Sequence, residues 1–347
     1  MNYSIYSKKE YKTTIENMVD NSFNTENKYF LRDKWNKPLI KFLSKNISDK
    51  LVYMGLPSPN GDDVNHWIEF IKVVIAFQCR EYSKPSNSTQ SREDVEKLEE
   101  FLRALERENK LESYVVYDGY LEEVVLKGKD NSPKSIHFEI QRFITLYNLD
   151  FCNDIASPIE FVDDLGDLQR VFKFDAIKKL ISLQKEISLF SNKFIFLLTV
   201  HCNYNGKELE NFLNNPPNKT IITFLAKYHK LKDIEKNSRI VRLFVVYLIH
   251  QHFLANDFSP KILPIIRYKG IKDTPLLHFV ILGIHTKSEA GATPIYQQFD
   301  EILNQKFVDI NESEFINSTK ILEEELDVQT NPVEYFSQSQ TFNKLWH

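Results

Sequence analysis

The sequence predicts an α/β fold, with a doubly wound, mostly parallel seven-stranded sheet that ends in a two-strand hairpin and carries helices on both faces. Apolar segments of strand length alternate with amphipathic segments of helical length along most of the chain. Strands that are apolar throughout are typical of a parallel sheet covered on both faces. The last two apolar segments, at 261–270 and 275–286, are separated only by a short turn. That spacing predicts the closing hairpin.

The first half of the chain supplies four strands and three helices. Its elements are expected at 28–47 (helix), 50–56 (strand), 62–71 (helix), 73–79 (strand), 92–109 (helix), 113–119 (strand) and 142–152 (strand). In the second helix, Val64, Trp67 and Ile71 fall at i, i+3 and i+7, and Asn60 or Asp62 can cap its start. Each helix is thereby expected to bury one face against the sheet.

The second half continues the alternation and then becomes acidic. Its elements are expected at 175–190 (helix), 193–206 (strand), 238–254 (helix), 261–270 and 275–286 (strands), and 294–305 and 313–326 (short helices). We divide the chain into an N-terminal helical extension (1–48), an α/β domain (49–287) and an acidic helical C-terminal extension (288–347).

The amino-acid composition is that of an ordinary globular protein. The chain has 347 residues, of which 42% are hydrophobic and 27% charged, as in ordinary globular domains. Three cysteines without regular spacing argue against a disulfide framework and a zinc cluster. The first residues lack the apolar core of a signal peptide, and no apolar run approaches the roughly 18 residues of a membrane span. We expect a cytoplasmic protein with no metal site and no membrane contact.

Charge is unevenly distributed. Residues 288–347 carry 3 basic and 11 acidic side chains, a balance of −8, and this tail is a candidate surface for a protein partner. Residues 219–242 hold seven Lys or Arg against two acids. This stretch is either a solvated helix face or a contact for nucleic acid. The contact would be made by Lys219, Lys227, Lys230, Lys232, Arg239 and Arg242.

This order of elements resembles that of the class I S-adenosylmethionine-dependent methyltransferases. Their Rossmann-like, seven-stranded sheet also ends in a hairpin with one antiparallel strand. The resemblance covers about residues 49–287 and implies S-adenosylmethionine as cofactor. Fold-level similarity does not by itself establish an activity, so each site of the family is compared with the residues of this chain.

The first strand should end in a glycine-rich turn beneath the methionine part of the cofactor. Here the turn reads GLPSPNG, and the resemblance assigns cofactor contacts to Gly55, Pro57 and Gly61. Proline fixes φ and removes an N–H donor, so the turn is stiffer than usual. Asp62 and Asp63 follow, where the cofactor carboxylate would lie.

The next two strand ends should hold the ribose and the adenine. Gln78 stands where the family has an acid that bonds both ribose hydroxyls, and an amide lacks the paired acceptors of a carboxylate. Asp118, followed by Gly119, resembles the residue that accepts from the adenine amino group. Asp-Gly before a helix is also an ordinary turn, so both interpretations stay open.

The fourth strand end should orient the methyl acceptor. The resemblance assigns this role to Asn148, Asp150 and Phe151, although the prolines of the family's motif are missing. Asp150 either holds an N–H or accepts a proton from the acceptor, or simply caps the next turn. Cys152 suggests a nucleophile, but a small apolar packing residue is the preferred interpretation.

Two hypotheses of function follow. The first is a methyltransferase acting on nucleic acid or another macromolecule, with an accessory role in nucleic acid modification or bacterial defence as one setting. The alternative is a catalytically degenerate protein of the same fold that serves as a binding, sensing or scaffold subunit of a larger assembly. A metal-dependent nuclease is not supported, because the sequence offers no carboxylate cluster at suitable spacing.

Overall fold

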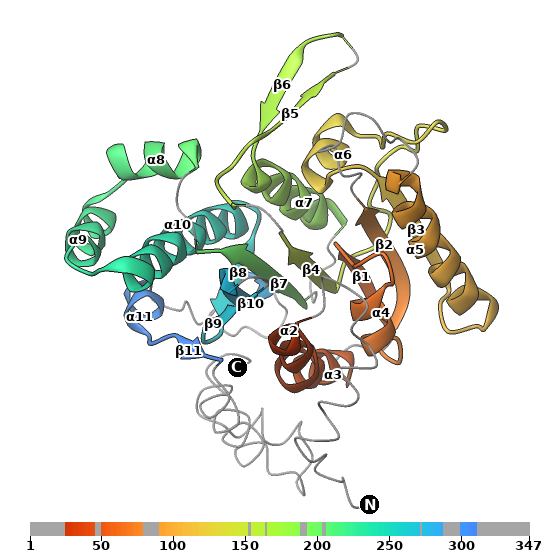
Figure 1. Cartoon of the computed structure of the whole chain (residues 1–347), viewed down its shortest axis with the longest axis horizontal. Helices are drawn as coiled ribbons and strands as arrows, with labels where there is room; N and C mark the ends of the chain where they lie inside the picture. The colour runs from red at the N-terminus through yellow and green to blue at the C-terminus, as the bar shows by residue number, and fades with distance from the viewer. Residues whose placement is uncertain are drawn as a thin grey trace, which may run out of the picture.

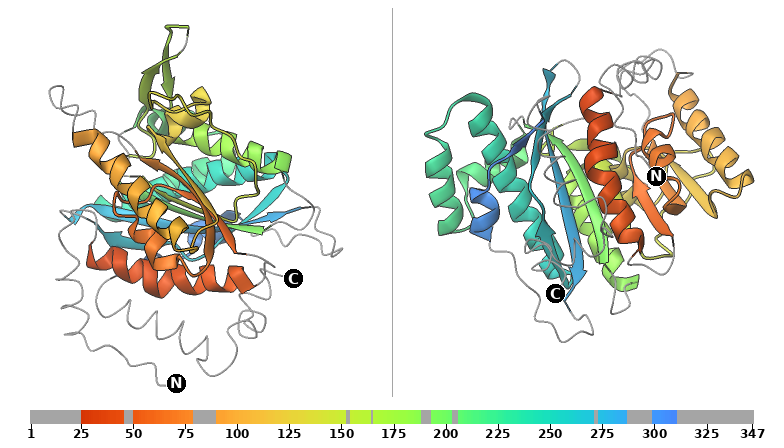
Figure 2. Two further views of the ribbon diagram at one scale, coloured as in Figure 1. Left: turned by 90° about the vertical axis from the view of Figure 1, so that its right-hand side faces the viewer. Right: turned by 90° about the horizontal axis from the view of Figure 1, so that it is seen from below.

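The computed structural model has three layers, a central sheet with helices on each face (Figures 1 and 2). It describes residues 25–45, 50–78, 90–151, 154–163, 165–187, 193–202, 206–270, 273–286 and 299–310. The predicted helix at 313–326 and most of the acidic tail lie outside these ranges.

Within the described ranges the central sheet contains nine strands by hydrogen bonding, and its core matches the predicted seven. The order along the sheet is β11-β9-β10-β7-β4-β1-β2-β3, and β8 also pairs with β10. The parallel strands are β1 (Leu51–Gly55), β2 (Ile71–Gln78), β3 (Ser113–Asp118), β4 (Leu146–Asp150) and β7 (Lys193–His201). Because β1, β2 and β3 extend to one side and β4 and β7 to the other, the strand order reverses between β1 and β4.

The far side of the sheet confirms the closing hairpin and adds detail. β10 (Pro275–His285) runs antiparallel to β7. Both β8 (Phe258–Ile262) and β9 (Ile266–Lys269) pair antiparallel with β10. The strand predicted at 261–270 therefore corresponds to β9 and the last two residues of β8. Pro264 lies in the gap between them, and a proline cannot donate to a ladder. The two-residue β11 (Val308–Asp309) then pairs with β9 and extends this edge.

Helices cover both faces, as predicted. One face carries α3 (Lys37–Lys45), α4 (Asp62–Trp67) and α5 (Gln90–Arg107). The opposite face carries α6 (Leu121–Lys127), α7 (Lys173–Ile187), α9 (Lys219–Tyr228), α10 (Asp233–Ala255) and α11 (Phe299–Asn304). The short α8 (Lys207–Asn214) precedes α9. Within the described residues, no helix combines the length and the apolar character needed to cross a bilayer.

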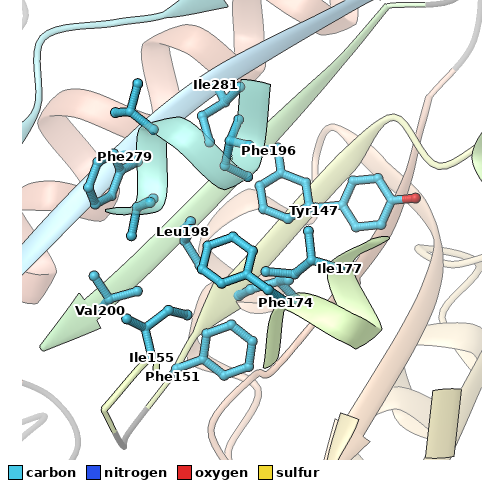
Figure 3. Close-up of a cluster of buried hydrophobic side chains, with 14 of the residues drawn as sticks. Tyr147, Phe151, Ile155, Phe174, Ile177, Phe196, Leu198, Val200, Phe279 and Ile281 are labelled. Carbon is cyan, nitrogen blue, oxygen red and sulfur yellow. The ribbon is translucent and has the colours of Figure 1, made fainter. Parts of the chain in front are cut away.

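The larger core lies between the sheet and α7 and α10. Tyr147, Phe196 and Leu198 from neighbouring strands meet Phe174 and Ile177 of α7, all with no more than 2% of their surface exposed (Figure 3). Burial of such side chains stabilises a fold by about 1.5–3 kcal/mol each. The sheet edge near the site is therefore supported by a rigid, well-packed interior.

The segment assigned to an N-terminal extension packs on the same sheet. It consists of α2 (Glu26–Phe30), a π-helix η1 (Leu31–Asn36) and α3, which run on as one rod. Leu39, Ile40 and Leu43 are buried in the second core with residues of β1, β7 and β10. π-Helical turns are rare and frequently mark functional sites.

A hairpin that the sequence analysis did not predict projects from the body. It is formed by β5 (Ile159–Val162) and β6 (Leu168–Val171), between β4 and α7 (Figure 1). Leu165 at its turn is 87% exposed. A two-stranded ribbon of four-residue strands leaves only a weak pattern in sequence, which is why it was missed.

Candidate functional site

The predicted site residues meet at one edge of the sheet, where the parallel strands end. Gly55 of β1 lies opposite Asn148 of β4, and Gln78 of β2 lies opposite Asp118 of β3. Asp150 lies opposite Thr199 of β7. Open α/β sheets bind ligands outside the carboxyl ends of their strands, at the point where the strand order reverses. In this chain that point lies between Gly55 and Asn148.

The turn after β1 is packed closely against the protein itself. A side chain at Gly55 would come within 2.5 Å of the Asn148 carbonyl oxygen, and one at Gly61 within 2.3 Å of the Phe101 ring. Gly61 also has φ +65°, in the left-handed region that favours glycine. Pro57 is buried in the same turn. The two glycines are thus explained by protein packing, without a ligand.

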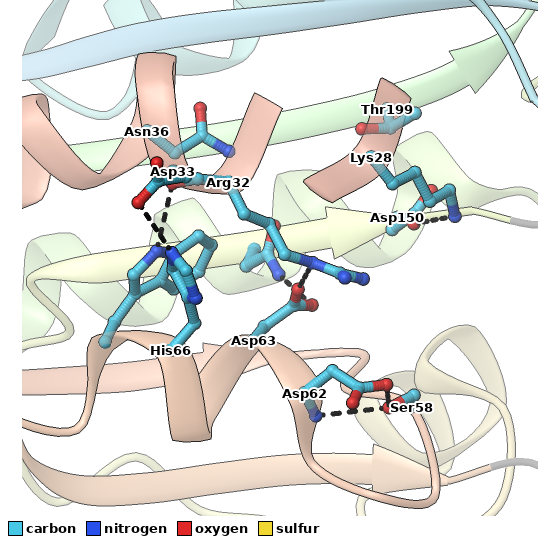
Figure 4. Close-up of polar contacts among 12 residues, drawn as sticks. Lys28, Arg32, Asp33, Asn36, Ser58, Asp62, Asp63, His66, Asp150 and Thr199 are labelled. Carbon is cyan, nitrogen blue, oxygen red and sulfur yellow. Dashed lines mark hydrogen bonds and ion pairs between the residues drawn. The ribbon is translucent and has the colours of Figure 1, made fainter. Parts of the chain in front are cut away.

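Asp62 and Asp63 have separate partners. Asp62 accepts a hydrogen bond from the Ser58 hydroxyl at 2.6 Å, and this pair closes the start of α4 (Figure 4). Asp63 forms a buried ion pair with Arg32 of η1, in which Arg32 Nε faces Asp63 Oδ1. Burial opposes the charge on Arg32, but Asp63 and its acidic neighbours outweigh this and raise the pKa of the guanidinium.

Asn148 connects this ion pair to β4. Its Nδ2 donates to Asp63 Oδ2 at 2.8 Å, and a longer contact of 3.4 Å reaches the Tyr53 hydroxyl. Asn148 is 5% exposed, so its amide is fixed in place. It supports the carboxylate that neutralises Arg32.

Asp150 is paired with Lys28 of α2 (Figure 4). Burial alone would raise the pKa of Asp150, but the Lys28 ammonium outweighs this and holds that pKa below its usual range. Asp150 thus does more than cap the next turn, because it forms an ion pair with a residue 122 positions away in the sequence.

A third polar contact joins the same segment to the sheet. His278 of β10 lies between Thr199 and Asn36, with Nδ1 at 2.9 Å from the Thr199 hydroxyl and Nε2 at 3.0 Å from Asn36 Oδ1. Burial lowers the pKa of His278 to about 4. A neutral ring fits this geometry, since Nε2–H donates to Asn36 while Nδ1 accepts from Thr199.

These contacts enclose a small pocket. Its cavity volume is about 20 Å³, which is room for one or two water molecules. The lining comprises Lys28, Leu31, Arg32, Asn36, Asp63, Trp67, Asn148, Asp150, Thr199, Tyr268 and His278. Four of these residues, Lys28, Leu31, Arg32 and Asn36, come from the segment α2–η1.

The other half of the edge, above β2 and β3, is arranged differently. Asp118 is 5% exposed, and the loop after α6 covers its backbone, because Asn131 N–H donates to the Asp118 carbonyl at 2.8 Å. Gly119 N–H donates to the Gln78 carbonyl at 3.0 Å. Gln78 itself is partly exposed. Asp118 and Gln78 are therefore side by side, as the resemblance requires.

Two of the predicted site and surface residues are buried elsewhere in the protein. Phe151 packs in the larger core, with Lys173 Nζ 5.6 Å from its ring centroid, and does not line the pocket, so the structure does not place it where the acceptor contact was predicted. Arg242 is fully buried and donates to the carbonyls of Leu303 and Gln305, so its assignment to a nucleic-acid surface is also wrong.

Most of the other basic residues predicted to contact nucleic acid do lie on the surface. Arg239 is paired with Glu235, whereas Lys219, Lys227, Lys230 and Lys232 are exposed. Cys152 lies outside the described residues. Among the described residues, no group of three or more His, Cys, Asp or Glu side chains is placed to hold a metal ion.

Sequence reasoning missed the partners that the N-terminal segment supplies. Lys28, Arg32 and Asn36 follow each other at intervals of four, which places them on one helical face. This polar stripe was the available signal. Thr199 and His278 sit inside apolar strands and gave none.

Comparisons with known proteins show similarity only in structure. No protein-family model matches the sequence, and no curated protein is significantly similar to it. One similar solved structure is the Streptococcus mutans protein SMU.1697c, a candidate methyltransferase in complex with SAH (12% identity, 71% of this chain and 96% of that chain, TM-score 0.32).

Two others are named methylases. They are an rRNA methylase from Streptococcus thermophilus (11% identity, 71% and 93% of the chains, TM-score 0.31) and the N-methyltransferase NodS from Bradyrhizobium japonicum (8% identity, 73% and 97%, TM-score 0.31). Because all three TM-scores are below 0.5, the assignments that follow rest on the geometry of this chain.

Proposed function

We propose that this chain is an S-adenosylmethionine-dependent methyltransferase that acts on a macromolecule. One observation carries the proposal. Gly55, Gln78 and Asp118 end three adjacent parallel strands, and Asn148 lies two residues before the end of the fourth, β4. Gly55 lies opposite Asn148, where the strand order reverses, and Gln78 lies opposite Asp118. That point of an open α/β sheet is where a ligand binds.

The residues present fit the cofactor by their chemistry. Asp118 can accept from an adenine amino group, and the Gln78 amide can bond a ribose hydroxyl. When bound, the cofactor supplies a methyl group on a positively charged sulfur. The chain itself would bind and orient the two reactants and exclude water, which provides most of the rate in such a transfer.

Calorimetric titration with S-adenosylmethionine and S-adenosylhomocysteine tests the proposal. We expect micromolar binding that weakens at least tenfold in Asp118→Asn, with Glu106→Gln on the exposed side of α5 as the matched control. Both variants must keep the far-ultraviolet circular dichroism of the parent protein. Absence of heat with both ligands, from folded protein free of copurified cofactor, would refute the proposal.

One observation favours the second candidate, a binding protein that keeps the fold without the transfer reaction. Lys28 and Arg32 occupy the space above β1 and β4 and neutralise its two carboxylates. For this candidate the exposed Lys219, Lys227, Lys230 and Lys232 would be the surface for a polyanion. The same titration separates the two, because only the methyltransferase requires cofactor binding.

A further inference from the structure

We infer that the Asp150 end of the pocket is a binding site for a lysine side chain of a protein acceptor, and that Lys28 occupies this site in its place. The inference deepens the proposed function, because it names the substrate class for the acceptor side of the same site. It concerns the surface formed by Asp150, Thr199, Tyr268 and His278, at the ends of β4, β7, β9 and β10.

The charge of the pocket selects a cation. Its lining contains two carboxylates, Asp63 and Asp150, and the remaining polar groups of the sheet and α4 that line it are neutral. The His278 ring is neutral as well, since burial lowers its pKa to about 4. Both cations in the lining, Lys28 and Arg32, come from the N-terminal segment. A carboxylate with so little access to water is stabilised by a positive partner, and a phosphate group would be repelled.

The two ion pairs lie at different depths. The side chains of Arg32 and Asp63 are 10% and 7% exposed, whereas those of Lys28 and Asp150 are 14% and 23% exposed. A long side chain that enters from solvent therefore meets Asp150 first. The Arg32–Asp63 pair forms a neutralised floor beneath it.

The segment that carries Lys28 is suited to withdrawal. α2 has five residues and buries none of them, while Leu39, Ile40 and Leu43 fix α3 in the core. Between them the π-helix departs from regular α-helical bonding. The Arg32 carbonyl accepts from Lys37 N–H and from Trp67 Nε1 at 3.3 Å. Release of α2 would thus expose Asp150, while the rod stays anchored from Leu31 onward by the buried residues of η1 and α3.

The occupant also shows which side chain fits. Lys28 presents an ammonium on an unbranched stem to Asp150, which is the form in which a protein lysine would arrive. Because Lys28 belongs to the same chain, it competes at a high effective concentration. An external lysine then binds weakly until Lys28 is removed or further contacts of a larger acceptor add to its affinity.

The test uses the full chain and the peptide Ac-Gly-Lys-Gly-amide, with Ac-Gly-norleucine-Gly-amide as the uncharged control of similar length. We expect Lys28→Ala to bind the lysine peptide at least tenfold more tightly than the parent protein does. The norleucine peptide should not bind, and Asp150→Asn in the Lys28→Ala background should abolish binding. If Lys28→Ala does not fold, Lys28→Gln replaces it.

Hydrogen exchange of the unmodified protein gives an independent readout. Saturating lysine peptide should increase exchange over residues 26–30 and leave residues 39–43 protected. Equal binding of both peptides, no binding to the variant, or unchanged exchange at 26–30 would overturn the inference. Increased exchange at 26–30 on addition of S-adenosylmethionine alone would mean that the cofactor, and not a lysine side chain, displaces Lys28 from Asp150, and would also overturn the inference. Peptide binding by a protein that binds no S-adenosylhomocysteine would refute the methyltransferase and leave the lysine site standing.

Discussion

Removal of the Arg32 guanidinium tests how the N-terminal segment is held. In Arg32→Met the apolar stem is kept, but Asp63 retains only the Asn148 amide among the polar contacts described here. Both partners of the ion pair are at most 10% exposed. Loss of one partner from a buried pair costs about 3–5 kcal/mol, because the other charge stays behind without compensation. We expect the lower end of this range, because Asn148 still donates to Asp63.

Urea unfolding followed by circular dichroism measures the effect, and thermal unfolding checks it. A loss of about 3 kcal/mol should lower Tm by roughly 4–6 °C in a chain of this size. The double variant Arg32→Met with Asp63→Asn removes the stranded charge and should recover half or more of the loss. Lys34→Met, on the same π-helix with a side chain 36% exposed, should stay within about 0.5 kcal/mol of the parent protein.

The reasoning would be refuted by a loss below about 1 kcal/mol in Arg32→Met. It would also be refuted if the double variant were as unstable as the single one, because stability would then depend on packing of the stem. Either result would mean that the segment is held by its apolar face alone.

Three further predictions concern pH and backbone geometry. Lys28 holds the pKa of Asp150 below its usual range. The stability lost in Lys28→Ala should therefore be greatest at pH 7 and shrink as pH falls below about 4. Urea unfolding of both proteins from pH 7 to pH 3 measures this loss, and a loss that stays constant with pH would contradict the prediction. The pKa of His278 is about 4 in the folded protein against about 6.5 unfolded, so this ring contributes stability that is complete above pH 6.5 and lost as pH falls towards 4. His278→Gln should therefore flatten the dependence of unfolding free energy on pH in that window, by up to about 1.4 kcal/mol per pH unit. An unchanged slope would contradict a neutral His278 ring in the folded protein. Gly61→Ala should lower Tm more than Gly128→Ala. Both glycines have positive φ, but only the Cβ added at Gly61 meets a neighbouring ring, at 2.3 Å. Equal losses of Tm would show that backbone strain alone accounts for the effect of both substitutions.

Much of the fold could be predicted because the signals are local. The length and continuity of apolar runs placed β1, β2, β3, β7 and β10 within a few residues of their observed bounds. The site edge followed from the same pattern, since parallel strands end on one side. β4 begins later than predicted, at Leu146. The preceding Ile144 instead bonds the Gln184 side chain, through its N–H at 3.1 Å and its carbonyl at 2.6 Å.

The contents of the site were harder to predict. Gly55 and Gly61 suggested a ligand cradle, but in the structure their missing side chains make room for Asn148 and Phe101. Phe151 and Arg242 have residue types that suit a binding surface, yet both are buried. A residue type at a strand end or on a helix does not say which face it occupies, and that choice depends on the whole packing.

The α/β class, the alternation of elements and the edge at which the polar strand ends meet can all be predicted from the sequence. These depend on hydrophobic period and run length, which act over a few residues. The ion pairs of Lys28 with Asp150 and of Arg32 with Asp63 are seen only in the folded chain. Lys28 and Asp150 are 122 positions apart in the chain, and no local pattern links them. The pairing arises because the docked helix brings two basic side chains to one buried and one partly buried carboxylate, and both carboxylates are stabilised by a cation.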